Sequence, residues 1–210
     1  MRVLDDSGAV AAAAAGAIAE AVRGGARTLV LAGGTTPEAT YRVLAGIDLP
    51  WGRVTVLFGD ERCVPPTDPE SNYRMARETL LDRVSPATVH RIPAELGPDE
   101  GAAAYQVVLE RLPRLDFVLL GIGEDGHCAS LFPGSPALGA AGFAVGVTGA
   151  PKPPPERVSL TLTALRGARQ VLFVATGAGK ADAVRRAVRG EVPAGMILGA
   201  EWIVDRAAAA

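Results

Sequence analysis

Short apolar runs alternate with amphipathic segments along most of this chain. The runs TLVLA, VTVLF, FVLLG and VLFVA are almost uninterrupted in aliphatic and β-branched residues, which is typical of strands buried on both faces. Between these runs, apolar residues recur at helical spacing. The expected helices are 9–22, 36–44, 72–83, 99–112 and 180–188, and the expected strands are 28–32, 54–58, 89–92, 117–121, 143–147, 158–162, 171–175 and 202–204.

Buried strands that alternate with amphipathic helices predict an α/β fold, with a mostly parallel sheet and helices on both faces. The chain has 210 residues and shows neither an internal repeat nor a linker long enough to divide it. We therefore expect a single domain over residues 1–210. A small β-containing appendage to the sheet is also expected.

Composition excludes several functional classes. Hydrophobic residues make up 49% and charged residues 21% of the chain, as in ordinary globular proteins. The net charge is −2 and no basic stripe is present, so nucleic acid is not expected as a partner. No apolar run reaches the length of a membrane span, and the two cysteines have no metal or redox spacing. We expect a cytoplasmic protein that binds neither membrane nor nucleic acid, as a monomer or weak homodimer.

The loop after the first buried strand reads Gly33-Gly34-Thr35. Ligands of open α/β sheets bind beyond the carboxyl ends of the strands, so the residues there are candidates for a site. Thr35 with Glu38 fits a capping box, and Thr36 followed by proline fits a helix start nearly as well. A glycine turn before a helix N-terminus favours phosphate binding, although a plain strand-to-helix turn has the same pattern.

The next two strand ends carry charged side chains. Asp60, Glu61 and Arg62 follow the second strand, and Arg62 would suit a phosphate or carboxylate, or an internal ion pair with its two acidic neighbours. His127, two residues after Asp125, follows the strand FVLLG. A histidine at such a loop is a candidate general base, with a structural loop histidine as the alternative.

This third loop also contains the spacing GxGxxG, but it does not indicate a dinucleotide site. Glu124 and Asp125 would place carboxylates against a pyrophosphate, and no acidic residue follows at the distance needed to hold a ribose. Cys128, directly after the histidine, is not expected to act as a nucleophile, because sequence neighbours usually point apart.

Lysine is rare, since Lys152 and Lys180 are the only two among 21 basic residues. Base-composition bias explains the general preference for arginine. Each lysine nevertheless lies beside a Pro- or Gly-rich turn and is a candidate anion contact. The residues before Lys180 do not complete a P-loop, and no metal-ligand spacing is present. The residues thus indicate a phosphate-sized anion site with one histidine base, no metal and no cofactor, suited to general-base chemistry on a small phosphorylated metabolite.

Five segments together resemble the 6-phosphogluconolactonase family. They are LAGGTTPEATYRVL (31–44), WGRVTVLFGDERCVPPTDPESNY (51–73), LDFVLLGIGEDGHCASLFPGSP (115–136), PKPPPERVSLTLTAL (151–165) and ATGAGKADAV (175–184). Each is weak alone, but the ordered set covers most of the chain.

The resemblance implies a modified Rossmann-like fold, shared with glucosamine-6-phosphate deaminase, ribose-5-phosphate isomerase and CoA transferases. It also implies cofactor-free hydrolysis of 6-phospho-D-glucono-1,5-lactone to 6-phosphogluconate, in the oxidative pentose phosphate pathway. His127 would activate water, with Asp125 or the rival Asp60 in support. The implied substrate-binding residues are Gly33, Gly34, Thr35, Asp60, Arg62, Gly126, Lys152, Arg157 and Lys180.

Cys128 departs from the family pattern, because the family usually has threonine after the histidine of this loop. We expect the exchange to matter little, on the view that the threonine hydroxyl caps the loop and does not touch substrate. Two other functions stay open: a glucosamine-6-phosphate deaminase or sugar-phosphate isomerase on the same fold, and a non-enzymatic sugar-phosphate sensor.

Overall fold

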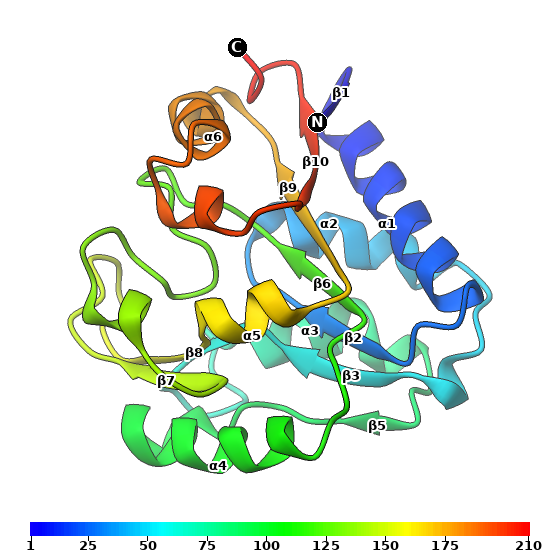
Figure 1. The fold of residues 1–210 in the computed structure, drawn as a ribbon. Helices are drawn as coiled ribbons and strands as arrows, with labels where there is room; N and C mark the ends of the chain where they lie inside the picture. Colours follow the sequence, from blue (N-terminus) through cyan, green and yellow to red (C-terminus); the bar gives the residue numbers. More distant parts are fainter.

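Seven parallel strands form the central sheet of the computed structural model, which describes residues 1–210 (Figure 1). Their spatial order is β1-β10-β9-β6-β2-β3-β5, and every neighbouring pair is parallel. The strands are β1 (Arg2–Leu4), β2 (Thr28–Leu31), β3 (Thr55–Phe58), β5 (Thr88–Val89), β6 (Phe117–Leu120), β9 (Gln170–Ala175) and β10 (Glu201–Asp205). This confirms the expected parallel α/β architecture.

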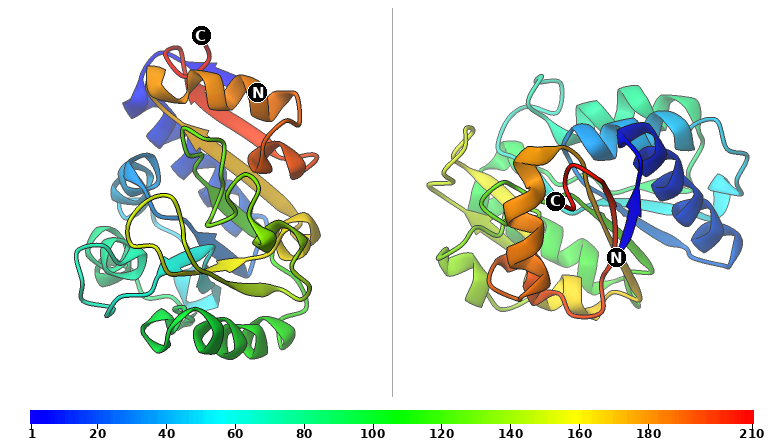
Figure 2. Two further views of the ribbon diagram at one scale, coloured as in Figure 1. Left: turned by 90° about the vertical axis from the view of Figure 1, so that its left-hand side faces the viewer. Right: turned by 90° about the horizontal axis from the view of Figure 1, so that it is seen from above.

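Helices cover both faces of this sheet. In Figure 2, seen from above, α1 lies on one side of the sheet and α6 on the other. The helices are α1 (Ser7–Arg23), α2 (Thr35–Leu44), α3 (Asn72–Thr79), α4 (Pro98–Glu110), α5 (Leu162–Gly167) and α6 (Ala181–Val188). The first helix begins where the Asp6 side chain accepts a hydrogen bond from the Ala9 N–H, and its buried face is mostly alanine. Such small side chains let α1 pack closely against α2 and the sheet.

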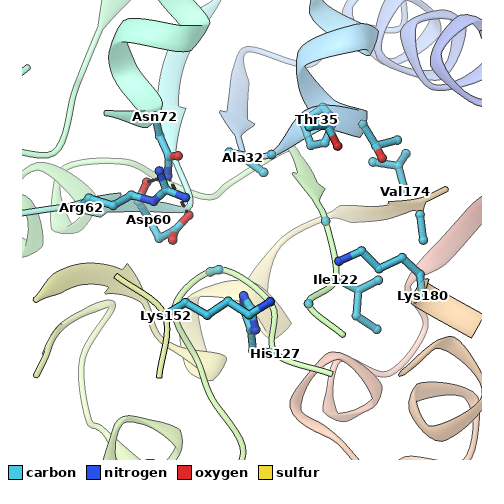
Figure 3. A pocket seen from close by; sticks show the side chains of 18 of the residues that line it. Ala32, Thr35, Asp60, Arg62, Asn72, Ile122, His127, Lys152, Val174 and Lys180 are labelled. Carbon is cyan, nitrogen blue, oxygen red and sulfur yellow. Dashed lines mark hydrogen bonds between the residues drawn. The ribbon is translucent and has the colours of Figure 1, made fainter. Parts of the chain in front are cut away.

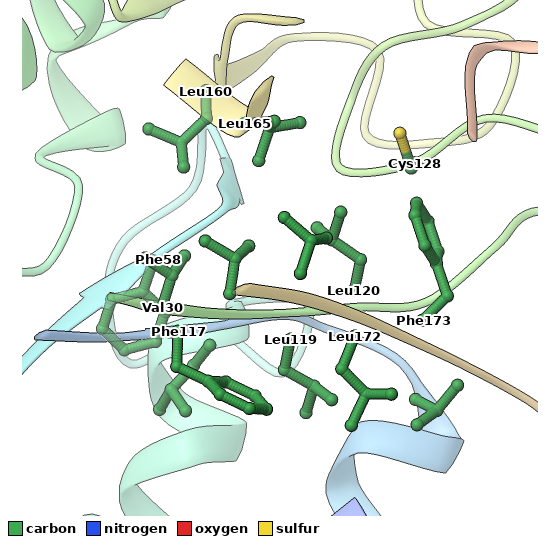
Figure 4. Packing of buried hydrophobic residues seen from close by; sticks show 14 of the residues in the cluster. Val30, Phe58, Phe117, Leu119, Leu120, Cys128, Leu160, Leu165, Leu172 and Phe173 are labelled. Atoms are coloured by element: carbon green, nitrogen blue, oxygen red, sulfur yellow. The ribbon is translucent and has the colours of Figure 1, made fainter. Parts of the chain in front are cut away.

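The core holds 54 buried hydrophobic residues, and Figure 4 shows side chains of the central strands packed at its middle. Two buried tyrosines join helices to strand ends. The Tyr41 hydroxyl, on α2, bonds both the N–H and the carbonyl of Ala32, and Tyr105, on α4, does the same at Phe58. Burial raises the pKa of both phenols, so both remain protonated donors. These bonds fix the carboxyl ends of β2 and β3, where the functional loops begin.

A second sheet of three antiparallel strands, in the order β4-β8-β7, lies beside the carboxyl edge of the first. Its strands are β4 (Asp60–Arg62), β7 (Ala144–Val147) and β8 (Arg157–Leu160), and α4 packs against it. Gly59 connects the two sheets, because its N–H donates to Leu31 and its carbonyl accepts from Leu160. This sheet is the β-containing appendage that the sequence analysis expected.

Some element boundaries differ from the expectation. The helix expected over 72–83 ends at Thr79, whose hydroxyl bonds the Met75 carbonyl, and a 3₁₀ turn follows. The strand expected over 89–92 is reduced to the two residues of β5. Three elements were not expected: β1, which is short and lies at the sheet edge; β4, whose residues are all charged; and α5.

Candidate active site

A cavity of about 360 Å³ opens at the carboxyl ends of four adjacent strands, β9, β6, β2 and β3 (Figure 3). The strand order reverses between β6 and β2, which is where open parallel sheets bind ligands. The loops after these strands form its wall, together with the small sheet and the Pro-rich segment. The predicted residues that line it are Gly33, Gly34, Thr35, Asp60, Arg62, His127, Lys152, Arg157 and Lys180.

The glycine loop leads into α2 without a side-chain cap. Gly34 is the N-cap with φ of 103°, a conformation that favours glycine, so neither predicted cap, at Thr35 or Thr36, forms. The Thr36 hydroxyl instead lies 2.8 Å from that of Thr176, after β9. The Thr36 hydroxyl, which was expected to cap the helix, is thus used in a tertiary hydrogen bond. The start of α2 lies at the cavity wall, and no side chain caps its N–H groups.

His127 and Asp125 form the closest polar pair of the site. The histidine Nδ1 lies 2.5 Å from Asp125 Oδ1, while Nε2 has no protein partner. Burial lowers the pKa of His127 and outweighs Asp125, which raises it. Burial is the largest single effect on Asp125 and raises its pKa, but the hydrogen bonds and the charge attraction from His127 together outweigh it, so the pKa of Asp125 lies below the usual range. A neutral imidazole therefore donates from Nδ1 to a carboxylate and keeps Nε2 as a base.

The three charged side chains of β4 point alternately to the cavity and to the start of α3. Glu61 is buried and accepts hydrogen bonds from the N–H groups of Arg62, Asn72 and Tyr73 and from the Ser71 hydroxyl. Burial raises the pKa of Glu61 despite these bonds. The carboxylate thus anchors the start of α3 rather than pairing with Arg62.

Arg62 reaches the cavity from the same strand, with Glu70 as its nearest carboxylate at 3.9 Å. It forms no ion pair with Asp60 or Glu61, so the alternative of an internal pair with these neighbours is wrong. Asp60 is buried, and its carboxylate accepts from Ser130 Oγ at 2.6 Å and from Asn72 Nδ2 at 3.2 Å.

Three further cations surround the cavity. Arg157 is 5% exposed and donates to the carbonyls of Lys152, Pro153 and Pro154, so it shapes the Pro-rich segment that carries Lys152. Burial lowers the pKa of Arg157 and of Lys180. Lys180 follows the loop after β9, whose Gly177 N–H is held by the carboxylate of Asp205. With Arg62, these side chains give the cavity an excess of positive charge.

Two predicted residues, Asp125 and Gly126, do not line the cavity. Asp125 reaches it only through His127. Gly126 has φ of 89°, and a Cβ there would come within 2.5 Å of the Val192 side chain, so its role is to turn the loop. The expected contact between Gly126 and the substrate therefore has no support in the structure, since Gly126 does not line the cavity.

Asn72 is a cavity residue that the sequence analysis missed. It belongs to the segment SNY that closes one of the family-like motifs, which was the available signal. Cys128 belongs to the buried core, where Figure 4 draws it, and it does not line the cavity. Burial raises its pKa to about 12. A nucleophilic thiol is thereby excluded, and the residue in place of threonine does not face a ligand.

The arrangement can bind an anion and accept a proton. No cluster of three potential metal ligands exists in the structure, and no helix is long and apolar enough to cross a membrane. The cationic cavity and the histidine–aspartate pair lie where the strand order of the parallel sheet reverses. This arrangement defines a Rossmann-like α/β protein with the framework of an active site.

The chain belongs to the glucosamine-6-phosphate isomerase/6-phosphogluconolactonase family, whose model matches residues 5–204. A 6-phosphogluconolactonase of Mycobacterium tuberculosis is 39% identical over all of this chain and 97% of its own length. The structure of 6-phosphogluconolactonase from Trypanosoma brucei superposes with a TM-score of 0.90 at 28% identity, covering 99% of this chain and 96% of that one. A monomeric glucosamine-6-phosphate deaminase, 22% identical over 100% and 99% of the two chains, shares the fold with a TM-score of 0.86.

Proposed function

We propose that this protein hydrolyses 6-phospho-D-glucono-1,5-lactone to 6-phosphogluconate, a step of the oxidative pentose phosphate pathway, without a cofactor. The observation that carries the proposal is a neutral His127 with a free Nε2 in a cavity surrounded by cations. Relatives such as the mycobacterial protein carry the lactonase name. The chemistry needs a phosphate site and a base, and the cations and His127 of this cavity suit these two roles.

In this proposal the phosphate binds among Arg62, Lys152 and Arg157. Arg62 would offer guanidinium N–H donors to the phosphate, and Lys152 would add a point charge. Arg157 would contribute mainly its charge, because its Nε and Nη2 groups already donate to carbonyls. Lys180 and the uncapped start of α2 provide further positive potential at the other side of the cavity, as Figure 3 shows for Lys180 and Thr35. The negative phosphate would then hold the lactone ring over His127.

Hydrolysis would proceed by attack of water on the C1 carbonyl. His127 Nε2 takes a proton from the water as its oxygen bonds to C1, which gives a tetrahedral oxyanion. Cations and backbone N–H groups of the glycine loop would stabilise this charge. When the intermediate collapses, the bond between C1 and the ring oxygen breaks, and the imidazolium returns the proton to that oxygen. This transfer makes His127 neutral again and leaves a carboxylic acid at C1 with a free hydroxyl at C5. The acid then loses its proton to solvent.

Asp125, rather than Asp60, is the carboxylate that supports His127 in this scheme. Its carboxylate contacts Nδ1 directly, whereas Asp60 bonds Ser130 and Asn72. The contact fixes the tautomer that leaves Nε2 unprotonated, and it stabilises the imidazolium formed during attack.

A deaminase or isomerase activity is the second candidate, and the common fold is its support. The higher identity to lactonases favours the first. We also propose that the protein acts in the cytoplasm as a monomer or weak homodimer, in keeping with its two free cysteines.

The deciding measurement is hydrolysis of freshly generated 6-phosphogluconolactone, with a control without enzyme because the lactone opens spontaneously. We expect rapid turnover by the wild type, and a loss on the order of 10²–10⁴ in kcat for His127→Ala, the usual contribution of a general base. His90, which lies outside the cavity, supplies the matched control: His90→Ala should retain wild-type turnover. Background rates with all three proteins, and ammonia release from glucosamine-6-phosphate, would support the deaminase instead.

A further inference from the structure

Asn72 is the one buried amide side chain that lines the cavity, and nothing in the proposed hydrolysis uses it. It is the first residue of α3 and is 3% exposed. Its Nδ2 group donates to the Asp60 carbonyl at 2.9 Å and to the Asp60 carboxylate at 3.2 Å. Because both contacts are acceptors, they fix which end of the amide is nitrogen.

The Oδ1 atom of Asn72 therefore points away from Asp60, and it accepts no hydrogen bond from the protein. It is not among the buried polar atoms that are sealed off without a partner. In Figure 3, Asn72 lies with Asp60 and Arg62 at one side of the cavity. The free acceptor is thus held rigidly at the cavity wall.

Gly33 makes this position possible. A Cβ at residue 33 would lie 2.0 Å from Asn72 Oδ1 and 2.6 Å from its Cγ. Any larger residue would push the amide off its two bonds to Asp60. The first glycine of the GGT turn therefore admits the Asn72 side chain, in addition to forming the turn.

Four of the nine polar side chains that line the cavity cannot accept a hydrogen bond. Arginine and lysine have no acceptor at all, and four of them line the cavity. Such groups suit a phosphate but not the hydroxyl groups of a sugar ring, which also need acceptors. Asn72 Oδ1 and the carboxylate of Asp60 fill that need.

We propose that Asn72 is a specificity-determining residue, whose Oδ1 accepts a hydrogen bond from one ring hydroxyl of the phosphorylated lactone. This inference rests on the proposed function, since it assigns recognition of a substrate hydroxyl to a residue of the same site. The ring offers hydroxyls at C2, C3 and C4 as possible donors. Loss of the paired hydroxyl leaves a buried acceptor without a partner, which is how a polar site rejects a deoxy analogue.

The test compares 6-phosphogluconolactone with its 2-deoxy, 3-deoxy and 4-deoxy forms, using wild type and Asn72→Ser. Serine is well tolerated at the start of a helix and leaves the amide position empty. On the full lactone we expect kcat/KM to fall about tenfold. On one deoxy lactone the substitution should cost less than about twofold, because the bond it removes is already absent.

Ser130→Ala is the matched control. It also removes one hydrogen bond to the Asp60 carboxylate, but Ser130 is fully buried and does not line the cavity. Its cost should be equal on all four lactones. If Asn72→Ser also lowers kcat/KM equally on all four, Asn72 only supports Asp60 and the proposal is overturned.

Turnover of the full lactone by the wild type separates this test from that of the function itself. Without such turnover the proposed function fails first. If the wild type turns over the full lactone but Asn72→Ser loses activity equally on all four lactones, the proposed function is supported and only the role of Asn72 is overturned. Gly33→Ala gives a second route to the same answer, because it displaces the amide without altering Asn72 and should produce the same selective loss.

Discussion

At the residue scale, the charge of His127 is decided by two opposed effects. Burial favours the neutral ring, and the Asp125 carboxylate favours the protonated one; burial is the larger and the pKa is lowered. A base of lowered pKa remains free at neutral pH. The pair therefore combines an available base with a fixed tautomer.

This balance predicts the acid limb of the pH profile. Activity requires neutral His127, so kcat/KM should fall with decreasing pH around a midpoint below pH 6.5, the ordinary value for histidine. In Asp125→Asn the carboxylate that raises the histidine pKa is lost, so the midpoint should move to still lower pH. The plateau rate should also drop about 10- to 100-fold, because the tautomer is no longer fixed.

Glu124→Gln is the control for this profile, since Glu124 is exposed and makes no bond to His127. It should leave the midpoint unchanged. A midpoint that moves upward in Asp125→Asn would mean that Asp125 does not act on the imidazole as described.

At the element scale, the loop after β6 depends on glycines for two different reasons. Gly123 lies under the imidazole, where a Cβ would come within 2.0 Å of His127 Nδ1. Gly126 turns the chain in a left-handed conformation and packs against Val192. The spacing that resembles a dinucleotide motif thus serves to fold a histidine back over its own loop.

Gly126→Ala should therefore both destabilise the protein and displace His127. Backbone strain and the contact with Val192 together should cost about 2–3 kcal/mol, which is about 5–10 °C in Tm. Activity should fall as well at temperatures where the variant is folded. Thermal unfolding followed by circular dichroism, with kinetics on the same sample, measures both effects.

Gly16→Ala is the matched control for that substitution. Gly16 lies inside α1 with open space around it, so alanine should stabilise the helix by about 0.5–1 kcal/mol and leave activity unchanged. Equal stability of Gly126→Ala and wild type would show that the turn is not constrained as the structure indicates.

At the scale of the whole molecule, the cavity lies between the parallel sheet and the smaller antiparallel one. Gly59 passes directly from β3 to β4, so Asp60 and Arg62 enter the cavity as extensions of the main sheet. The Pro-rich segment before β8 adds Lys152 from the other sheet. A bound phosphosugar would therefore contact residues that come from both sheets.

Product binding should consequently stabilise the whole fold. At a concentration of 100 times its Kd, 6-phosphogluconate should raise the free energy of unfolding by about 2.7 kcal/mol. Gluconate, which lacks the phosphate, should have a much smaller effect at the same concentration, and added salt should reduce the shift by screening the cations. An equal shift in Tm with both compounds would argue against the cationic phosphate site.

The sequence by itself determined the parallel sheet, most of its helices and the loops that carry the chemistry. Buried strands and amphipathic helices leave local periodic patterns in the sequence. The pairing of His127 with Asp125 is local as well, because the two residues are two positions apart in one loop. The roles of β4, Arg157 and Asn72 left no such pattern. The run of three charges was expected to lie in a loop, although Glu61 is buried and accepts hydrogen bonds from the N-cap and the first two residues of α3.

Only the tertiary structure decided which polar groups meet. The Thr36 hydroxyl, expected to cap a helix, bonds Thr176, and Arg157 holds the segment of Lys152. The amide of Asn72 reaches the cavity because Gly33, far away in the chain, has no side chain. Periodicity records whether a residue faces the core or the solvent, but a hydrogen bond depends on the partner that folding brings within 3 Å, and that partner is set by the packing of distant segments.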